Sequence, residues 1–153
     1  MFMTAKVDMK KIAIAIAAVA VVLLVLILLL GGSGDRTAAG TGLSSNDARV
    51  QYLKGLGWEV SASPVESGQV RIPTKTTEVY DRYNDLQKSQ GFDLTSFAGK
   101  TAMRYVYKVN NYPNATDPVY ATLLIYKGQL IGGDITDTAV GGTIRGLEKR
   151  ADT

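Results

Sequence analysis

Hydrophobic residues fill one uninterrupted stretch near the start of the chain. Residues 12–30, from Ile12 to Leu30, are 19 consecutive Ala, Val, Ile and Leu residues. A helix of this length is about 28 Å long, which matches the hydrocarbon core of a bilayer, about 30 Å thick. A helix buried in a soluble protein rarely needs apolar residues on every side. The pattern therefore predicts a transmembrane helix over residues 12–30.

The residues that flank this stretch predict its orientation. Lys6, Lys10 and Lys11 precede it, and positively charged flanks stay on the cytoplasmic side of a membrane. We therefore expect residues 1–11 to form a cytoplasmic tail and everything after the span to lie outside. The alternative is a signal peptide that is removed by cleavage within the glycine-rich residues 31–34.

Two helices are predicted beyond the span. Residues 31–45 are rich in Gly, Ser, Thr and Ala and are typical of a flexible linker with a reach of roughly 20 Å. Ser44 or Ser45 is a suitable N-cap for a first helix that ends near Lys54. A second helix is predicted between about residues 76 and 90, where apolar side chains recur with helical spacing and Gly follows. Its predicted buried stripe consists of Val79, Tyr83, Leu86 and Gln90.

Strand patterns dominate the rest of the chain. From Met103 to Val109 every second residue is apolar and the residues between them form a mixed face, which is the period of a half-buried strand. Residues 119–126 are apolar on both faces, as in a central strand, and residues 130–135 follow after a tight turn. Shorter strands are predicted at residues 58–60 and 70–72. The pair Gly132 and Gly133 predicts a bulge or a close approach of another segment.

These elements predict an α+β domain over residues 46–148 with a short tail, residues 149–153. We expect two helices packed against one face of a mainly antiparallel sheet of three to five strands, preceded by one transmembrane helix. About 100 residues are enough to bury a core without disulfides or metals.

Composition narrows the chemistry of this domain. The chain has 17 Lys and Arg, 14 Asp and Glu, no His and no Cys. The two absences exclude disulfides, thiol catalysis, His-based metal sites and Ser-His-Asp triads. Much of the net charge of +3 comes from the lysines before the span, so no nucleic-acid partner is expected. No cofactor is predicted. The absence of Cys fits an exported protein of a bacterial envelope.

Four sequence blocks resemble a known family. They read YLKGLGWEV, RIP…VYDRYNDLQKSQGFDL, YVYKVNNYP and VYATLLIYKGQLIGGDI, in this order. Together they resemble a bacterial domain of unknown function, family 4830, over roughly residues 50–147. The sequence departs from that pattern at Thr76 or Thr77 and at Gly141 and Gly142. The resemblance implies a shared fold and an envelope location, but no activity and no functional residues.

Two groups of residues are candidates for binding. Asn110, Asn111 and Tyr112 connect two strands, and amide and aromatic side chains suit recognition of a glycan or a peptide. The alternative is an ordinary hairpin loop. Asp134 and Asp137 sit at the end of the last predicted strand, where paired carboxylates would serve glycoside hydrolysis or bind a hard cation. The alternative is a turn-capping Asp134 and a solvated Asp137.

The sequence thus predicts a single-pass membrane protein that displays a non-catalytic binding module outside a bacterial cytoplasmic membrane. Its expected partner is an envelope protein or a cell-wall component. One alternative is a carboxylate-dependent hydrolase that acts on cell-wall glycan. Another is a sensor or accessory subunit whose span pairs with a second membrane protein.

Overall fold

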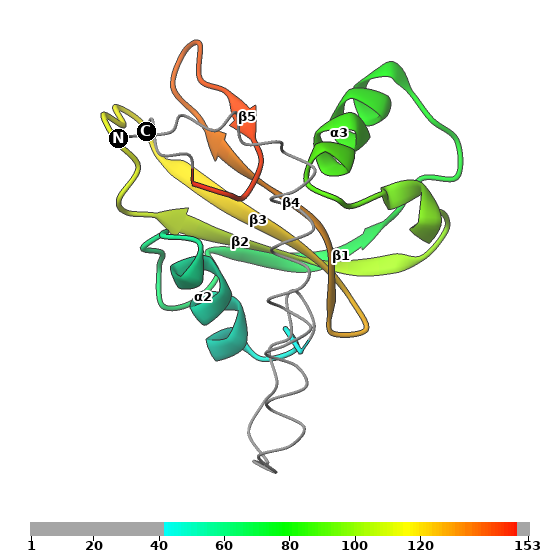
Figure 1. Ribbon diagram of the computed structural model, residues 1–153, viewed down its shortest axis with the longest axis horizontal. Coiled ribbons are helices and arrows are strands. Elements are labelled where there is room, and N and C mark those ends of the chain that lie inside the picture. Colours follow the sequence, from blue (N-terminus) through cyan, green and yellow to red (C-terminus); the bar gives the residue numbers. More distant parts are fainter. Residues whose placement is uncertain (1–41, 150–153) are drawn as a thin grey trace, which may run out of the picture.

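The computed structural model describes residues 42–149 (Figure 1). The elements are helix α2 (Asn46–Gly55), strand β1 (Glu66–Arg71), helix α3 (Glu78–Ser89), the 3-10 helix η1 (Leu94–Phe97), and strands β2 (Thr101–Val109), β3 (Val119–Tyr126), β4 (Gln129–Asp137) and β5 (Ile144–Arg145). All neighbouring strands are antiparallel, and their order in the sheet is β1-β2-β3-β4-β5. The predicted α+β class, with two α-helices and an antiparallel sheet, is confirmed.

The predicted transmembrane helix, residues 12–30, lies outside the described residues, as do the predicted cytoplasmic tail and most of the predicted linker. Within residues 42–149, none of the helices combines the length and the apolar character that crossing a membrane requires.

Helix α2 begins where the sequence predicts. The side chain of Ser45 accepts a hydrogen bond from the backbone N–H of Ala48, at 3.2 Å, and so caps the first turn. The fold begins slightly earlier than the predicted boundary at residue 46, because Leu43 is fully buried in the core.

The two helices lie on opposite faces of the sheet, not on one face as predicted. Successive residues of a strand point to opposite faces. On β3, Leu123 packs in the cluster that contains α2, whereas Leu124 packs in the cluster that contains α3 and η1. We call these sides the α2 face and the α3 face. Both faces of β3 are covered, which explains why this strand is apolar on both sides.

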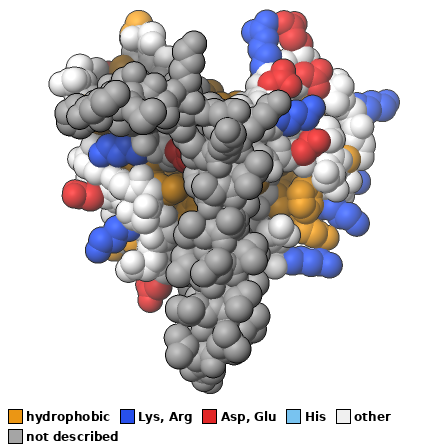
Figure 2. Space-filling view, in the orientation of Figure 1, with side chains coloured by type: hydrophobic (Ala, Val, Ile, Leu, Met, Phe, Trp, Pro, Cys, Tyr) orange, Lys and Arg blue, Asp and Glu red, His pale blue; other side chains and the backbone are white. Residues whose placement is uncertain are grey.

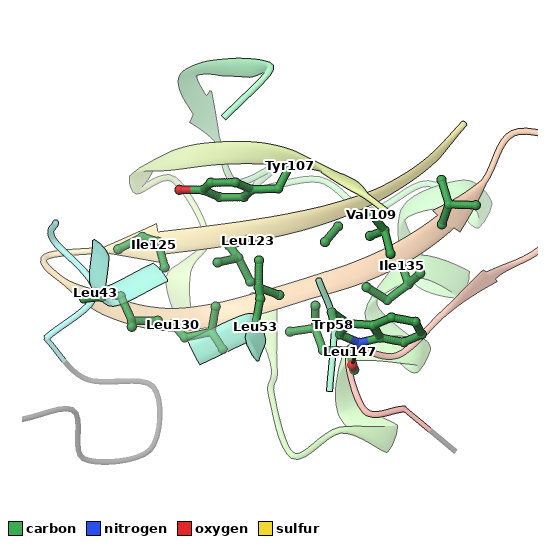
Figure 3. Close-up of a cluster of buried hydrophobic side chains, with 13 residues drawn as sticks. Leu43, Leu53, Trp58, Tyr107, Val109, Leu123, Ile125, Leu130, Ile135 and Leu147 are labelled. Atoms are coloured by element: carbon green, nitrogen blue, oxygen red, sulfur yellow. Dashed lines mark hydrogen bonds between the residues drawn. The ribbon is translucent and has the colours of Figure 1, made fainter. Parts of the chain in front are cut away.

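The α2 face carries the larger hydrophobic cluster (Figure 3). Leu53 from α2 lies against strand residues such as Leu123, and Trp58 and Leu147 close one end of the cluster (Figure 3). Trp58 is fully buried, and its indole N–H donates to the carbonyl oxygen of Leu147 at 2.6 Å. Trp58 therefore joins the segment after α2 to the C-terminal segment.

Helix α3 is held differently. The residues that it buries are polar, Asn84 and Gln87, whereas Val79 of the predicted stripe is 79% exposed. Gln87 Oε1 accepts from the backbone N–H of Gly133 at 2.8 Å, and Gln90 Nε2 donates to the carbonyl of the same residue at 3.0 Å. The two side-chain amides thus bond to the N–H and the carbonyl of Gly133, as a neighbouring strand would do. Gly133 lies outside the short part of β4 that pairs with β5.

The glycine pair of β4 is explained by close packing. The register between β3 and β4 shifts at Leu124 and Ile125, which is the predicted irregularity. A Cβ atom on Gly132 would lie 3.0 Å from Gln87 Oε1, and one on Gly133 would lie 2.8 Å from a methyl group of Leu147. Larger residues would push away both α3 and the C-terminal segment.

The short strands differ from the prediction. The strand expected at residues 70–72 is longer and begins at Glu66. Residues 58–60 form no strand, and only Val60 makes an isolated bridge with Val109. Strand β5 is not among the predicted strands, and it pairs with Ile135 and Thr136 of β4.

Candidate functional site

The chain joins the sheet beside the β3–β4 turn. The backbone N–H of Leu43 donates to the carbonyl of Gly128 at 2.9 Å. Lys127 and Gly128 both have positive φ, 48° and 76°, which is the two-residue turn that best matches twisted strands. Arg49, only 5% exposed, donates to the carbonyls of Leu43 and Ser44 at 3.0 and 2.8 Å. We call this end of the sheet the turn end.

Arg49 also fixes this segment to the sheet. Its Nε donates to the hydroxyl of Tyr107 at 2.9 Å, and its guanidinium lies 3.6 Å from the centre of the Tyr105 ring. The segment that continues from the predicted linker is therefore attached at a defined place on β2.

Two loops lie at the opposite end of the sheet, residues 110–118 between β2 and β3 and residues 138–143 between β4 and β5. In Figure 1 they lie at the upper left, away from the β3–β4 turn at the lower right. The backbone N–H and the hydroxyl of Thr138 both donate to the carbonyl of Pro118, at 3.2 and 2.6 Å. We call this pair of connected loops the loop end.

The first loop contains the predicted binding residues, but the side chains of two of them, Asn111 and Tyr112, stabilise the fold. Asn111 Oδ1 accepts from the backbone N–H of Glu59, and its Nδ2 donates to the carbonyl of Gly57, both at 2.9 Å. The backbone N–H of Asn110 donates to the carbonyl of Glu59 at 2.7 Å, while the residue itself is exposed. Of the two Asn residues, Asn110 alone is free to contact a ligand through its side chain.

Tyr112 is half-buried in an aromatic and cationic stack. Its ring lies parallel to that of Trp58, with 5.9 Å between centroids and 11° between planes. The guanidinium of Arg145 lies 5.1 Å from the Tyr112 ring and 5.4 Å from the Trp58 ring, and Lys149 Nζ lies 5.3 Å from Trp58. These cation–π contacts hold the C-terminal segment against the base of the loop.

The second loop is held by backbone hydrogen bonds and presents one apolar side chain to solvent. The backbone N–H of Asp137 donates to Thr143 O at 3.0 Å, and that of Gly142 donates to Ala139 O at 2.8 Å. A Cβ on Gly142 would lie 2.3 Å from the carbonyl oxygen of Asp137, so the turn requires Gly there. Val140, at its tip, is fully exposed.

Asp134 is buried on the α3 face. Its two carboxylate oxygens accept hydrogen bonds from the hydroxyls of Tyr83 and Thr136, both at 2.7 Å. Burial raises the pKa of the Asp134 carboxyl above its ordinary value, although the two hydrogen bonds and the positive charge of Arg104 act to lower it. Burial and the charge of Asp134 raise the pKa of the Tyr83 hydroxyl. The contact joins α3 to β4.

Asp137 lies on the other face. Its carboxylate accepts from the backbone N–H of Ala139 at 3.0 Å, which is ordinary turn chemistry. Asp134 is paired with Thr122 and Asp137 with Val119, three positions apart on the same strand, so the two side chains point to opposite faces. The converging pair of carboxylates that the hydrolase alternative requires is therefore not formed. No group of acidic residues able to hold a metal ion occurs within residues 42–149.

The structure thus separates the five predicted site residues. Asn110, Asn111 and Tyr112 belong to the loop end, and Asp137 is the strand residue directly before its second loop, whereas Asp134 lies under α3. The sequence reasoning missed Arg145, which lies over the Tyr112 ring, and Val140. Gly141 and Gly142 lie between these two residues in the sequence, but nothing in the local pattern indicated contact with residues 58 and 112.

Comparison with known proteins gave one match. The model of the family described as Domain of unknown function (DUF4830) matches residues 52–135, which is more than half of the chain. No curated protein and no solved structure matched.

Proposed function

The chain belongs to the family described as a domain of unknown function (DUF4830), and on that premise we propose that it is a membrane-tethered binding module of the bacterial cell envelope. In this proposal residues 12–30 cross the cytoplasmic membrane once, with the N-terminus inside and the domain outside. The domain is non-catalytic and holds an envelope protein or a cell-wall component. The loop end makes the contact.

This proposal rests on one observation, the separation between the turn end and the loop end. The chain reaches the sheet next to Gly128, whereas residues 110–118 and 138–143 lie at the other end of the strands. Strand β3 has eight residues and is therefore about 26 Å long. A domain tethered at the turn end holds the loop end away from its own membrane and toward the envelope.

The construction of the loop end supports a binding role. Thr138 connects the two loops, Asn111 fastens the first loop to residues 57 and 59, and the stack with Trp58 holds Tyr112 in place. A surface that is already ordered loses little conformational freedom when it binds. The exposed side chains on these braced loops include Asn110, Asn114 and Val140.

The test is capture of cross-linked envelope material by the tagged full chain from its own membranes. A loop-end variant carries Asn110→Ala, Asn114→Ala and Val140→Ala. A matched control carries three substitutions at exposed positions elsewhere, Gln69→Ala, Val79→Ala and Lys88→Ala. We expect the loop-end variant to lose at least about tenfold of the captured partner, as removal of contact residues of an interface does, and the control to keep it.

Equal capture by both variants would overturn the assignment of the loop end. Asn111→Ala and Tyr112→Ala are unsuitable for this experiment, because both side chains brace the domain and their loss is expected to lower its stability. A tether of residues 1–42 alone serves as the blank and should capture nothing.

A further inference from the structure

Positive side chains gather at the turn end. Arg71 ends β1 opposite Thr101, and Lys100 lies directly before β2. Lys127 occupies the β3–β4 turn, and the exposed Lys75 follows β1, next to Thr74, whose methyl group packs near Gly99. We call the four exposed cations the basic rim: Arg71, Lys75, Lys100 and Lys127. Figure 2 shows blue side chains and no red one at the lower right, where this turn lies in Figure 1.

Few carboxylates oppose this charge. Asp47, in the first turn of α2, is near the place where the chain joins the sheet. Asp93 caps η1, and its carboxylate already accepts hydrogen bonds from Thr95 and Asn84, which hold its pKa at about 2. No salt bridge involves any residue of the basic rim within residues 42–149. The rim therefore presents charge that no described side chain neutralises by direct pairing.

Aromatic rings lie among these cations. Phe97 and Tyr126 meet edge to face, with 5.6 Å between centroids, and both are half-buried. Lys127 Nζ lies 5.4 Å from the Tyr126 ring. An amphipathic ring such as that of Tyr126, beside Lys or Arg, is typical of surfaces that lie at the headgroup level of a bilayer. Exposed lysines alone would not indicate contact with a bilayer. These lysines, however, lie at the turn end together with the two rings and with Leu43.

We propose that the basic rim rests on anionic phospholipid headgroups of the membrane in which the chain is anchored. This inference rests on the proposed function. Twelve residues separate Leu30 from Leu43, and a linker of the composition predicted there has a reach of about 20 Å. The tether thus keeps the rim near the surface, and each cation within a Debye length, about 8 Å, strengthens the contact about fivefold. Docking of the rim orients the loop end away from the bilayer.

The experiment measures the distance between the rim and the lipid surface in the full chain. The chain has no Cys, so Gln129→Cys gives one label at the turn end and Val140→Cys gives one at the loop end. The reconstituted protein is placed in vesicles of phosphatidylcholine alone or mixed with phosphatidylglycerol, with a fluorescent headgroup as acceptor. We expect greater energy transfer from position 129 than from position 140 in the anionic vesicles, and a loss of that excess at about 1 M salt, where the Debye length is about 3 Å.

Charge reversal identifies the residues responsible. The variant Lys75→Glu, Lys100→Glu and Lys127→Glu should lower the transfer from position 129 to its value in neutral vesicles. The control Lys54→Glu, Lys88→Glu and Lys108→Glu has the same net charge but changes exposed lysines off the rim, and it should keep the excess. Equal transfer from position 129 in neutral and anionic vesicles, or equal losses in both variants, would overturn the proposal.

Flotation in alkaline carbonate separates the two ideas. If the protein floats with the vesicles but its orientation does not depend on lipid charge, docking of the basic rim on lipid is refuted and the proposed membrane tether is retained. If the protein leaves the vesicles, the tether itself is refuted and the rim is refuted with it.

Discussion

On the α2 face, apolar side chains from α2, the sheet and the C-terminal segment surround Trp58. On the α3 face, α3 is held through Gln87 and Gln90 on β4, and through Tyr83 on Asp134. Apolar burial depends mainly on area and volume, so many arrangements serve it almost equally well. Buried amides and carboxylates require particular partners at particular angles. The α2 face carries the larger hydrophobic cluster, whereas specific hydrogen bonds on the α3 face fix the position of α3.

The largest expected effect lies on the α2 face. Trp58→Ala removes a fully buried ring, its hydrogen bond to Leu147 and its stack on Tyr112. We expect it to lower the free energy of unfolding by about 3–5 kcal/mol, the range for loss of a large buried aromatic side chain. Circular dichroism during thermal unfolding measures the change. Trp58→Phe, which keeps a ring, should cost clearly less, and equal losses would mean that packing is not the cause.

On the α3 face, Gln87→Leu tests whether polar attachment is needed. This change keeps the size of the side chain and removes Gln87 Nε2, which is buried without a hydrogen-bond partner among the described residues. It leaves the buried backbone N–H of Gly133 without its acceptor. An unsatisfied buried donor costs about 1–3 kcal/mol. Trp58 is the only Trp, so its fluorescence during urea unfolding gives the value. A Leu variant as stable as the wild type would show that α3 packs by apolar contact after all.

A smaller effect with a distinct pH dependence is expected at Asp134. Its pKa is raised in the folded state, so the folded protein binds a proton before the unfolded chain does. The free energy of unfolding should therefore rise as pH falls from above the folded pKa toward the ordinary value, about 3.9, and level off below it. Asp134→Asn cannot titrate, so the wild type should gain stability relative to this variant over that window. A constant difference between the two proteins would contradict the assignment.

The smallest effect is expected at Val79. This residue occupies the apolar stripe read from the sequence of α3, yet it is 79% exposed. Val79→Ser should change the free energy of unfolding by less than about 0.5 kcal/mol, as surface substitutions usually do. Leu53→Ser, on the buried side of α2, is the matched comparison and should be strongly destabilising. A large cost at Val79 would mean that α3 packs in a different rotation.

These differences show which features can be predicted from sequence. The strand over residues 119–126 was predictable because both of its faces are apolar, and Ser45 was predictable because a cap requires only local residues. Gln87 was not predictable, because its role depends on Gly133, which is distant in the sequence. The same reason applies to Tyr112, whose partners Trp58 and Arg145 lie on other segments. Local sequence patterns predict helices and strands, but they do not predict which distant residues will be the partners of an isolated polar group.

The most direct test of the proposed function is to determine on which side of the membrane the domain lies. The measurement is labelling of the full-length Val140→Cys variant with a membrane-impermeant maleimide, in intact cells and after permeabilisation. Because the chain has no other Cys and position 140 is fully exposed, any signal reports that position. If the domain lies outside the membrane as proposed, we expect full labelling in intact cells, with no increase on permeabilisation. Labelling only after permeabilisation would place the domain inside the cell and contradict the proposed envelope function.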